Sequence, residues 1–284
     1  MTFNNKLQRK DTIFLFIFVW INLLDMKRIF VCVLFLCVAV ASISGQTRLR
    51  VVAYNVGVFS KYADDSMQDI ANMMHELDAD AVAVCELDSC NRRHATFQLQ
   101  DFAQMLSDEW SYRFGSAMQW NGGAYGTGLV THASIMNSFE IKLPKGEGYE
   151  PRICVVAETS SYVLAAVHLD HSSEDVRVKQ ADLLTDELKT RYGKSRKPVF
   201  LCGDLNATPD SRTLRRLSED WTVLSDPAPT YPSDNPRQCI DYILALNNRA
   251  RYKVQKTAVL MEAASADVVK ASDHLPVYVD VILK

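Results

Sequence analysis

The segment Ser272-Asp273-His274-Leu275-Pro276-Val277 places an aspartate beside a histidine, directly before the apolar run from Val277 to Leu283. This order predicts a loop whose polar residues meet a strand as it enters a core. Burying such a pair is costly unless both side chains have partners. A carboxylate beside an imidazole is also what metal-assisted phosphate chemistry uses. A solvated Asp-His turn is the commoner arrangement, so the segment gains weight from a second polar cluster after an apolar strand, Gly203-Asp204-Leu205-Asn206.

Outside these two clusters, hydrophobic periodicity predicts alternating strands and helices, with extra strands in the middle of the chain. Helical spacing occurs at 66–77, 96–106 and 173–192, and Ser211 opens a short helix. The predicted strands are 49–56, 81–85, 112–118, 125–131, 134–143, 153–158, 162–169, 198–202, 239–245, 254–260 and 277–283. Nearly continuous apolar runs are typical of sheets covered by helices on one face and by a second sheet on the other. We therefore expect one α/β domain without internal repeats.

The N-terminus carries two apolar runs, 12–24 and 29–43, neither of which reaches the ~20 residues that a membrane-spanning helix needs. The second run has the order of a secretory signal: a start at Met26, a basic pair, an apolar stretch and a small-residue zone that ends at Gly45. We expect residues 1–45 to be an extension and signal, and residues 46–284 to be the mature domain, secreted or periplasmic. The alternative is a membrane anchor formed by residues 12–43.

Composition limits the partners of the chain. It has 284 residues, of which 48% are hydrophobic and 23% charged, as is typical of a globular protein with a sizeable core. Residues 1–45 hold five basic and two acidic residues, so their removal takes the formal charge from −3 to −6. A net acidic body argues against an avid, sequence-independent binder of duplex DNA, because phosphate neutralisation supplies most of that affinity. Nucleic acid is therefore a disfavoured partner, although a local basic cleft would still allow it.

Five cysteines follow residue 45, at Cys85, Cys90, Cys154, Cys202 and Cys239. An odd number cannot form a complete disulfide framework within one chain. Three of them lie in apolar runs, where a small buried hydrophobe is the expected role. A bridge between Cys85 and Cys90 stays open, and no spacing indicates a zinc site.

Unusual polar residues mark the ends of several predicted strands. A glutamate directly after a buried strand needs a partner or a metal. The residues are Asn55, Glu86, His168, Asp204, Asn206 and Asp241. Each one alone is more often structural, but a purely structural role for all of them would require many separate coincidences. Carboxylate and amide oxygens without a thiolate cluster favour Mg²⁺ or Mn²⁺. Such an ion beside Asp and His suits hydrolysis of a phosphate ester.

An ordered set of segments resembles the endonuclease/exonuclease/phosphatase superfamily, which includes DNase I-like nucleases, abasic-site endonucleases, neutral sphingomyelinases and inositol-polyphosphate 5-phosphatases. The segments are Tyr54-Asn55, Cys85-Glu86, Tyr125-Gly126-Thr127-Gly128, Pro151-Arg152, Val167-His168-Leu169-Asp170, Gly203-Asp204-Leu205-Asn206, Ile240-Asp241-Tyr242 and Ser272-Asp273-His274-Leu275-Pro276. The resemblance covers about residues 49 to 283. It implies a four-layer α/β sandwich, with two mixed β-sheets packed face to face and helices on the outer faces.

The resemblance also implies roles for the matching residues. Glu86 would be the principal metal ligand, with Asn55 and Asp273 nearby as direct or water-mediated ligands. Asp204 would orient or deprotonate the attacking water, and Asn206 would position that water and the phosphate.

The histidines would lie on the phosphate side. His274 would contact the scissile phosphate while Asp241 holds it, because an adjacent negative charge favours the imidazolium. His168 would be the second phosphate-side histidine. Arg152 would either support the phosphate pocket or form a structural pair. Asp170 is a candidate substrate contact, with a solvated loop residue as the alternative.

Two departures from the family pattern bear on the activity. Several nucleases place an acidic residue two positions after the first-strand asparagine, where this chain has Gly57, which favours a single-metal mechanism. The segment Val167-His168-Leu169-Asp170 is more similar to the phosphatase, phosphodiesterase and sphingomyelinase branches than to abasic-site endonucleases.

We therefore expect an exported, monomeric hydrolase dependent on Mg²⁺ or Mn²⁺. Its substrate would be a phosphomonoester or phosphodiester of a small molecule, sugar, lipid head group or nucleotide. One alternative is a secreted DNase I-like nuclease. Another, of a different class, is a catalytically inert binding protein on the same fold.

Overall fold

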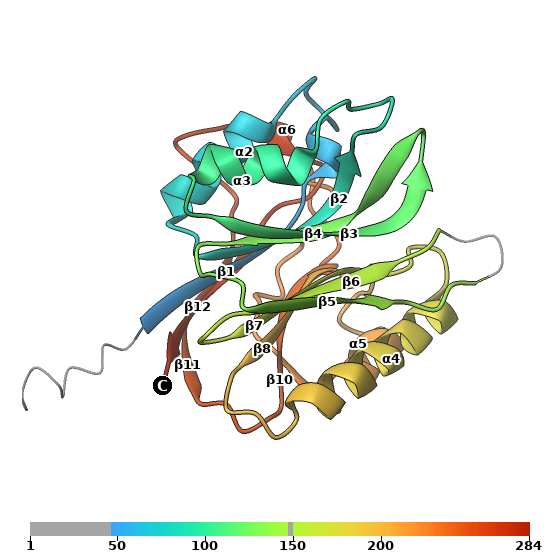
Figure 1. Cartoon of the computed structure of the whole chain (residues 1–284), viewed down its shortest axis with the longest axis vertical. Helices are drawn as coiled ribbons and strands as arrows, with labels where there is room; N and C mark the ends of the chain where they lie inside the picture. The colour runs from blue at the N-terminus through green and yellow to red at the C-terminus, as the bar shows by residue number, and fades with distance from the viewer. Residues whose placement is uncertain (1–46, 147–149) are drawn as a thin grey trace, which may run out of the picture. The chain divides into compact units, whose positions relative to one another are not determined.

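The computed structural model describes residues 47–146 and 150–284. The predicted extension, the start at Met26 and the signal lie outside the described residues. The first of two six-stranded sheets has the strand order β11-β12-β1-β2-β4-β3. Its strands are β1 (Thr47–Asn55), β2 (Ala81–Ser89), β3 (Ser111–Trp120), β4 (Gly123–Thr131), β11 (Tyr252–Val259) and β12 (Val277–Leu283). Its outer face is covered by α2 (Met67–Leu77), α3 (Gln98–Leu106) and α6 (Val268–Ala271), while a short turn, η1 (Gly57–Phe59), follows β1 (Figure 1).

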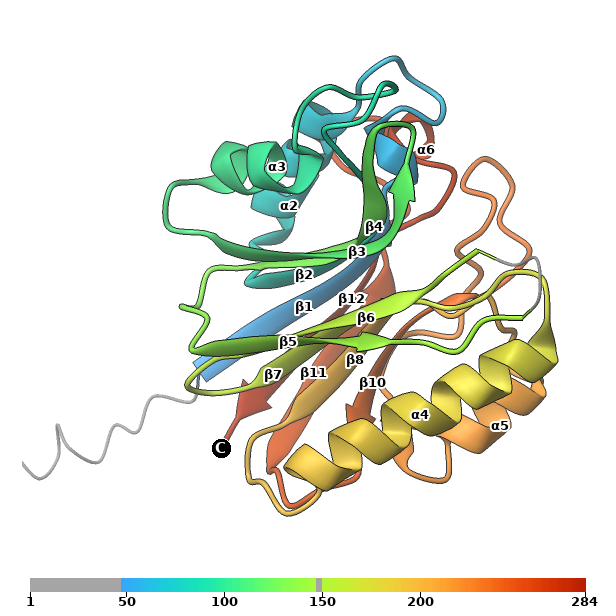
Figure 2. The ribbon, with the colours of Figure 1, turned by 45° about the vertical axis from the view of Figure 1, so that its right-hand side comes forward.

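The second sheet has the strand order β5-β6-β7-β8-β10-β9. Its strands are β5 (Asn137–Lys142), β6 (Ile153–Glu158), β7 (Val163–His168), β8 (Val199–Asp204), β9 (Trp221–Val223) and β10 (Asp241–Leu246). The helices α4 (Glu174–Tyr192) and α5 (Arg212–Leu217) lie on its outer face, away from the first sheet (Figure 2). Each sheet is mixed, because β1 runs parallel to β2, and β7 parallel to β8, within otherwise antiparallel sheets.

Alternation along β1 explains the layers. Val51 and Ala53 face the second sheet, where they join a buried cluster with Ala166 and Phe200. Residues of β1 between these positions, such as Val52, pack in a separate cluster with α2 and α3. A third cluster joins the second sheet to α4 and α5. Successive strand residues point to opposite faces, so a strand apolar on both faces is covered on both sides. The predicted four-layer α/β sandwich is confirmed.

The largest difference from the predicted elements concerns β2. The sequence predicts that this strand ends at Cys85, but β2 continues to Ser89. Its pairing with β4 shifts between Val84 and Leu87, so a β-bulge carries the strand past Glu86. The elements β9 and α6 are not predicted either, because three or four residues are too short to show a period.

The open disulfide question has a structural answer. Cys85 is buried and Cys90 is exposed, and both are free thiols. The thiol of Cys85 donates to the carbonyl oxygen of Val167, at 3.2 Å, and so links β2 to β7 across the two sheets. Within the described part of the chain, no helix is both long and apolar enough to cross a membrane.

Candidate active site

Three strand ends of the second sheet present their polar residues in one row. β7 and β8 are parallel, and His168 pairs with Asp204 at their carboxyl ends. β10 runs antiparallel to β8, and its first residue, Asp241, pairs with the same Asp204. The register of the sheet therefore fixes the order His168, Asp204, Asp241 before any side-chain contact is considered.

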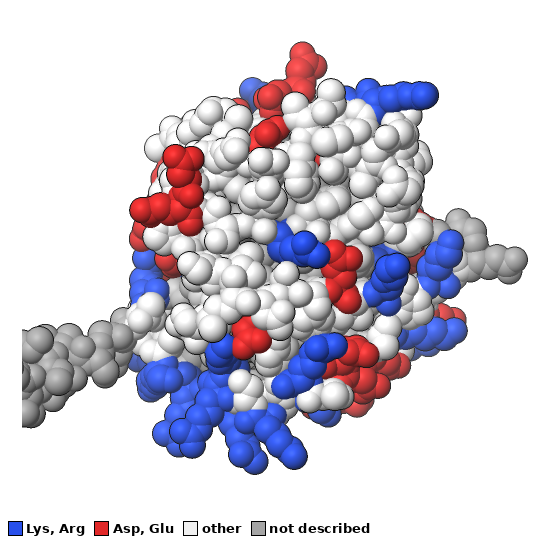
Figure 3. All heavy atoms as spheres, viewed as in Figure 1, with Lys and Arg blue, Asp and Glu red and all other residues white. Residues whose placement is uncertain are grey.

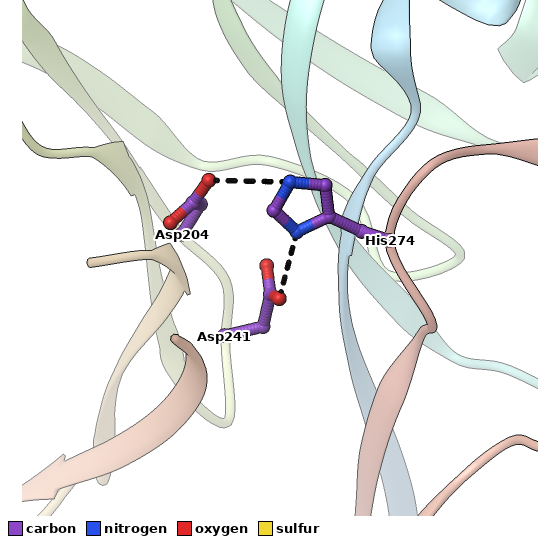
Figure 4. A group of neighbouring side chains, drawn as sticks. All are labelled: Asp204, Asp241 and His274. Carbon is purple, nitrogen blue, oxygen red and sulfur yellow. Dashed lines mark hydrogen bonds and ion pairs between the residues drawn. The ribbon is translucent and has the colours of Figure 1, made fainter. Parts of the chain in front are cut away.

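The loop before β12 brings a second histidine to this row. His274 Nδ1 lies 2.9 Å from Asp241 Oδ2, and His274 Nε2 lies 3.7 Å from Asp204 Oδ2 (Figure 4). Thr230 Oγ1 donates to the same oxygen of Asp241 at 2.5 Å, and the Tyr231 ring packs on the imidazole at 4.7 Å between ring centroids. The imidazole is thus held along one edge and on one face.

Electrostatics favour the imidazolium form of His274. Burial by itself would lower the pKa of His274, but the charge and hydrogen bond of Asp241, followed by the charge of Asp204, raise that pKa to about 10. Both ring nitrogens then carry protons. Nδ1–H donates to Asp241, and Nε2–H faces Asp204 at a distance too long for a strong hydrogen bond.

Asp204 has the properties of a general base that works near neutral pH. Burial, and then the charge of Asp241, raise its pKa to about 7, although His274 and two hydrogen bonds oppose the rise. Its Oδ1 accepts from the backbone N–H of Asn206 at 2.8 Å, and its Oδ2 accepts from Asn55 Nδ2 at 3.1 Å. Because the efficient pKa of a general base lies close to the working pH, this carboxylate suits removal of a proton from water.

His168 is held as a neutral donor on the other side of Asp204. Burial, followed by the positive charge of Arg152, lowers the pKa of His168 well below its ordinary value. Arg152 Nη1 lies 3.1 Å from His168 Nδ1, and a guanidinium can only donate, so Nδ1 is the acceptor. The ring proton is therefore on Nε2, which lies 3.4 Å from Asp204 Oδ2.

The first sheet contributes a pair of carboxylates. Glu86 lies on the bulge of β2 with a φ of 59°, and its Oε1 accepts from Asn55 Nδ2 at 3.0 Å. Asp273 precedes His274. The ammonium of Lys61 lies 3.2 Å from Asp273 Oδ2 and 4.0 Å from Glu86 Oε2, so one cation already contacts both acids. Two oxygen donors around one positive charge fit Mg²⁺ or Mn²⁺.

A second group close enough to hold a metal is Asp204, Asp241 and His274, whose ligand atoms all lie within 4.8 Å of one another. In His274, however, Nδ1–H is committed to Asp241 and the raised pKa keeps a proton on Nε2. A metal ion bound by this histidine would first have to displace a proton from the ring. Proton transfer and phosphate contact by this group, and metal binding by Glu86 with Asp273, therefore stay predictions that this geometry allows.

Comparison with known proteins agrees with this geometry. The model of the Endonuclease/Exonuclease/phosphatase family matches residues 52–274. The chain belongs to this family. The family comprises nucleases and phosphatases, so its shared chemistry is hydrolysis of phosphate esters.

Solved structures share the fold at low sequence identity. A family protein from Bacteroides thetaiotaomicron superposes with a TM-score of 0.67 at 18% identity, covering 84% of this chain and 96% of its own. A mannosyl-6-phosphatase from the same organism gives 0.67 at 18% identity, covering 83% and 100%. The catalytic domain of human Nocturnin, with a bound sulfate, gives 0.65 at 18% identity, covering 84% and 95%. No curated protein matches the sequence.

The structure brings most of the predicted family residues into one cluster. Hydrogen bonds and ion pairs connect Asn55, Glu86, Arg152, His168, Asn206, Asp204, Asp241 and His274, while Asp273 joins through Lys61. Of the two roles expected for Arg152, its contact with His168 supports a structural pair, and a phosphate contact stays a prediction.

Two predicted residues are engaged mainly with the backbone. Asn206 has a φ of 48°, and its Nδ2 donates to the carbonyl of Leu169 at 3.1 Å, so its contact with water or phosphate stays a prediction. Asp170 is fully buried, and its Oδ1 accepts from the backbone N–H groups of Ser172 and Ser173 just before α4. These contacts support the loop, and they do not favour the substrate role expected for Asp170.

Several residues that contact the family cluster were not predicted, and three of them lie beside its carboxylates and His274. They are Lys61, Thr230 and Tyr231. All three lie in loops between elements, where no apolar run or spacing marks a functional side chain.

A hollow of about 500 Å³ opens beside Glu86. Its lining combines apolar and charged side chains: Glu86, Arg93, Met118, Trp120, Tyr125, Glu150 and Pro151. Trp120 is 45% exposed, which is unusual for a tryptophan. The hollow therefore offers an aromatic surface next to the site of chemistry.

Proposed function

We propose that this protein is a divalent-metal-dependent phosphatase that hydrolyses the phosphate ester of a small sugar phosphate. The observation that carries the proposal is the setting of Asp204. A base with a pKa of about 7 lies between a neutral histidine, an imidazolium and an amide, beside the carboxylates Glu86 and Asp273. This set of a base, two donors and two carboxylates supports attack of water on a phosphate ester.

The residues divide the work as follows. Asp204 accepts a proton from the attacking water, while Asn55 and His168 orient its carboxylate through contacts of 3.1 Å and 3.4 Å. His274 donates Nε2–H to the phosphoryl oxygen on which negative charge develops. Asp241 keeps that imidazole charged. An ion held by Glu86 and Asp273 would neutralise a phosphoryl oxygen.

The hollow beside Glu86 supports a small, polar leaving group. Its volume of about 500 Å³ lies in the range of small-molecule sites. Trp120 offers a flat apolar surface for a sugar ring, and Arg93 and Glu150 offer hydrogen-bonding groups. The negative charge of Glu150 opposes a second phosphate group. A protein named a mannosyl-6-phosphatase has the same fold, which is consistent with this substrate class.

A nuclease activity has less support from the charge distribution. Basic side chains gather at the lower end of the face in Figure 3, where the chain finishes. Arg196, Arg249, Arg251 and Lys284 line a hollow of about 640 Å³ there. β12 separates this end from His274, and its length corresponds to about 20 Å at the usual rise per strand residue. The basic cluster therefore lies away from the site that would cut DNA.

We also propose that the protein is exported. The basic pair, apolar stretch and small-residue zone at residues 26–45 support this proposal. N-terminal sequencing of the product secreted by cells would test it. A mature chain that still begins at residue 1 or at Met26 would contradict cleavage.

The function is tested with purified protein, Mg²⁺ and a panel of sugar phosphates, inositol phosphates, sphingomyelin, RNA and plasmid DNA. We expect inorganic phosphate from a sugar phosphate, and its loss with EDTA or with Asp204→Asn. Nicking of DNA without release of phosphate would establish the nuclease instead. If Asp204→Asn and His274→Ala left every detected hydrolysis unchanged, the inert binding protein would be the better interpretation.

A further inference from the structure

One cationic side chain at the site has no part in the proposed reaction. Lys61 Nζ lies 3.2 Å from Asp273 Oδ2 and 4.0 Å from Glu86 Oε2. These are the two carboxylates assigned to the metal. The side chains of Asp273 and Glu86 are only 10% and 20% exposed, whereas that of Lys61 is 43% exposed. An ammonium thus occupies the region between two half-enclosed acids, and solvent reaches it from one side.

The turn η1 brings Lys61 to this position. Gly57, Val58 and Phe59 have φ values of 52°, 53° and 56°, so three consecutive residues are left-handed. A β-branched residue such as Val58 rarely adopts this conformation, and such strain persists only where surrounding contacts enforce it. The side-chain amide of Gln98 donates to the carbonyl of Val58 at 2.7 Å, and Phe59 is fully buried.

A second set of contacts fixes the residue next to Lys61. Ser60 Oγ lies 3.2 Å from His94 Nε2, and His94 Nδ1 lies 2.7 Å from a carboxylate oxygen of the buried Asp88. Lys61 therefore extends from an anchored turn. These contacts place the backbone of Lys61 within reach of the two carboxylates.

Gly57 leaves space for the stem of the lysine. A Cβ atom at Gly57 would lie 2.9 Å from Lys61 Cβ and 3.3 Å from Asp273 Oδ1. The resemblance described in the sequence analysis implies an acidic residue at this position in several nucleases. In this chain the aliphatic stem of Lys61 fills the space that such a side chain would need. The absence of a side chain at Gly57 and the presence of the Lys61 ammonium at the site are therefore linked, because both side chains would need the same space.

We propose that Lys61 is a built-in competitor of the metal ion. Without metal, its ammonium neutralises Glu86 and Asp273; when the ion binds, the side chain withdraws to the solvent on its exposed side. The proposal rests on the metal-binding role of these two acids in the proposed function. Its consequence is that Lys61 lowers the affinity for metal, because the ion must displace a favourable ion pair.

The decisive measurement is metal binding, without any substrate. Mn²⁺ is titrated calorimetrically into metal-stripped wild type, Lys61→Met, Lys61→Arg and the control Lys253→Met, which removes an exposed lysine near the far end of β11. For Lys61→Met we expect a dissociation constant lower by roughly 2- to 5-fold, as for loss of a partly exposed ion pair. Lys61→Arg, which keeps the charge, should bind no tighter than wild type. Lys253→Met should change the constant by less than about twofold.

Thermal melting supplies a second readout. In EDTA, Lys61→Met should melt below wild type, because two acids lose their cation, and saturating Mn²⁺ should raise its melting temperature by more than that of wild type. Salt separates direct competition from a long-range charge effect. In 1 M KCl the Debye length falls to about 3 Å, so a long-range effect disappears while direct displacement persists.

Each contrary result has a definite meaning. Unchanged or weaker Mn²⁺ binding by Lys61→Met would contradict the proposal that Lys61 competes with the metal. An increase in affinity that vanishes in 1 M KCl would contradict it too. Neither result would affect the proposed phosphatase activity. If no variant bound metal and hydrolysis continued in EDTA, both the competitor and the metal-dependent mechanism would fall. If metal bound as expected but no phosphate ester were hydrolysed, only the proposed function would fail.

Discussion

Arg152 donates a hydrogen bond from Nη1 to Nδ1 of His168, across 3.1 Å, and both side chains are almost fully buried. This contact selects one tautomer of the imidazole. The proton that remains, on Nε2, is the one that faces Asp204. Arg152 thereby sets the direction in which His168 donates.

The first prediction concerns this contact. Arg152→Met should lower kcat by about 10- to 100-fold, as is found for partners that orient metal-bound histidines, with a smaller effect on KM. Nitrogen NMR of the imidazole would show loss of the single tautomer of His168. A low kcat with the tautomer unchanged would assign the loss to another function of Arg152.

The second prediction concerns pH. Asp204 must be deprotonated to act as a base, so activity should rise as pH increases through about 7. His274 must stay protonated to donate, so activity should fall as pH increases through about 10. In Asp241→Asn the loss of negative charge lowers both pKa values, so both limbs of the kcat/KM profile should move to lower pH, by about one pH unit or more. Limbs that moved in opposite directions would contradict the assignment of Asp241.

The third prediction concerns the metal. EDTA should abolish hydrolysis, and added Mg²⁺ or Mn²⁺ should restore it. Glu86→Gln should raise the metal concentration for half-maximal activity by at least about tenfold, or about 1.4 kcal/mol. Glu187→Gln, an equal charge change in the exposed part of α4, is the matched control. An equal metal requirement in the two variants would rule out Glu86 as a ligand.

The fourth prediction concerns the hollow beside Glu86. Trp120→Ala should raise KM for a hexose phosphate and leave kcat nearly unchanged, since a stacking surface binds substrate and transition state alike. The expected loss in kcat/KM is about 1–2 kcal/mol, or roughly 5- to 30-fold. Met261→Ala, at another exposed apolar residue, should have no such effect. If Trp120→Ala and wild type hydrolysed every sugar phosphate equally well, the hollow would have no role in substrate binding.

The parts of the site that could be predicted share one property. Asp204 and the pair Asp273-His274 stand directly beside apolar strands, so a polar residue at such a boundary is conspicuous in the sequence. The buried runs themselves predict two covered sheets, because continuous apolar strands need cover on both faces. The order of the polar segments along the chain then indicated the endonuclease/exonuclease/phosphatase family.

Other parts depend on geometry that the sequence does not display. Nothing between Ala81 and Ser89 marks the extra residue that turns Glu86 toward the site, since a bulge changes pairing without changing hydrophobicity. Lys61 comes from a polar loop, where a lysine is normally solvated. Its role follows only from the left-handed turn and the absent side chain of Gly57, which are properties of the backbone in three dimensions.

The site has a half on each sheet. Asn55 and Glu86 belong to the first sheet, and His168 and Asp204 to the second, and the layer between the sheets holds small residues such as Ala53. Distances such as the 3.1 Å between Asn55 and Asp204 therefore depend on the thickness of that layer. A larger side chain there costs about 1–3 kcal/mol, which a stable domain can survive, yet it would part the two halves. A substitution such as Ala53→Val should accordingly lower activity more than it lowers the melting temperature, so activity reports on the packing between the sheets more sensitively than stability does.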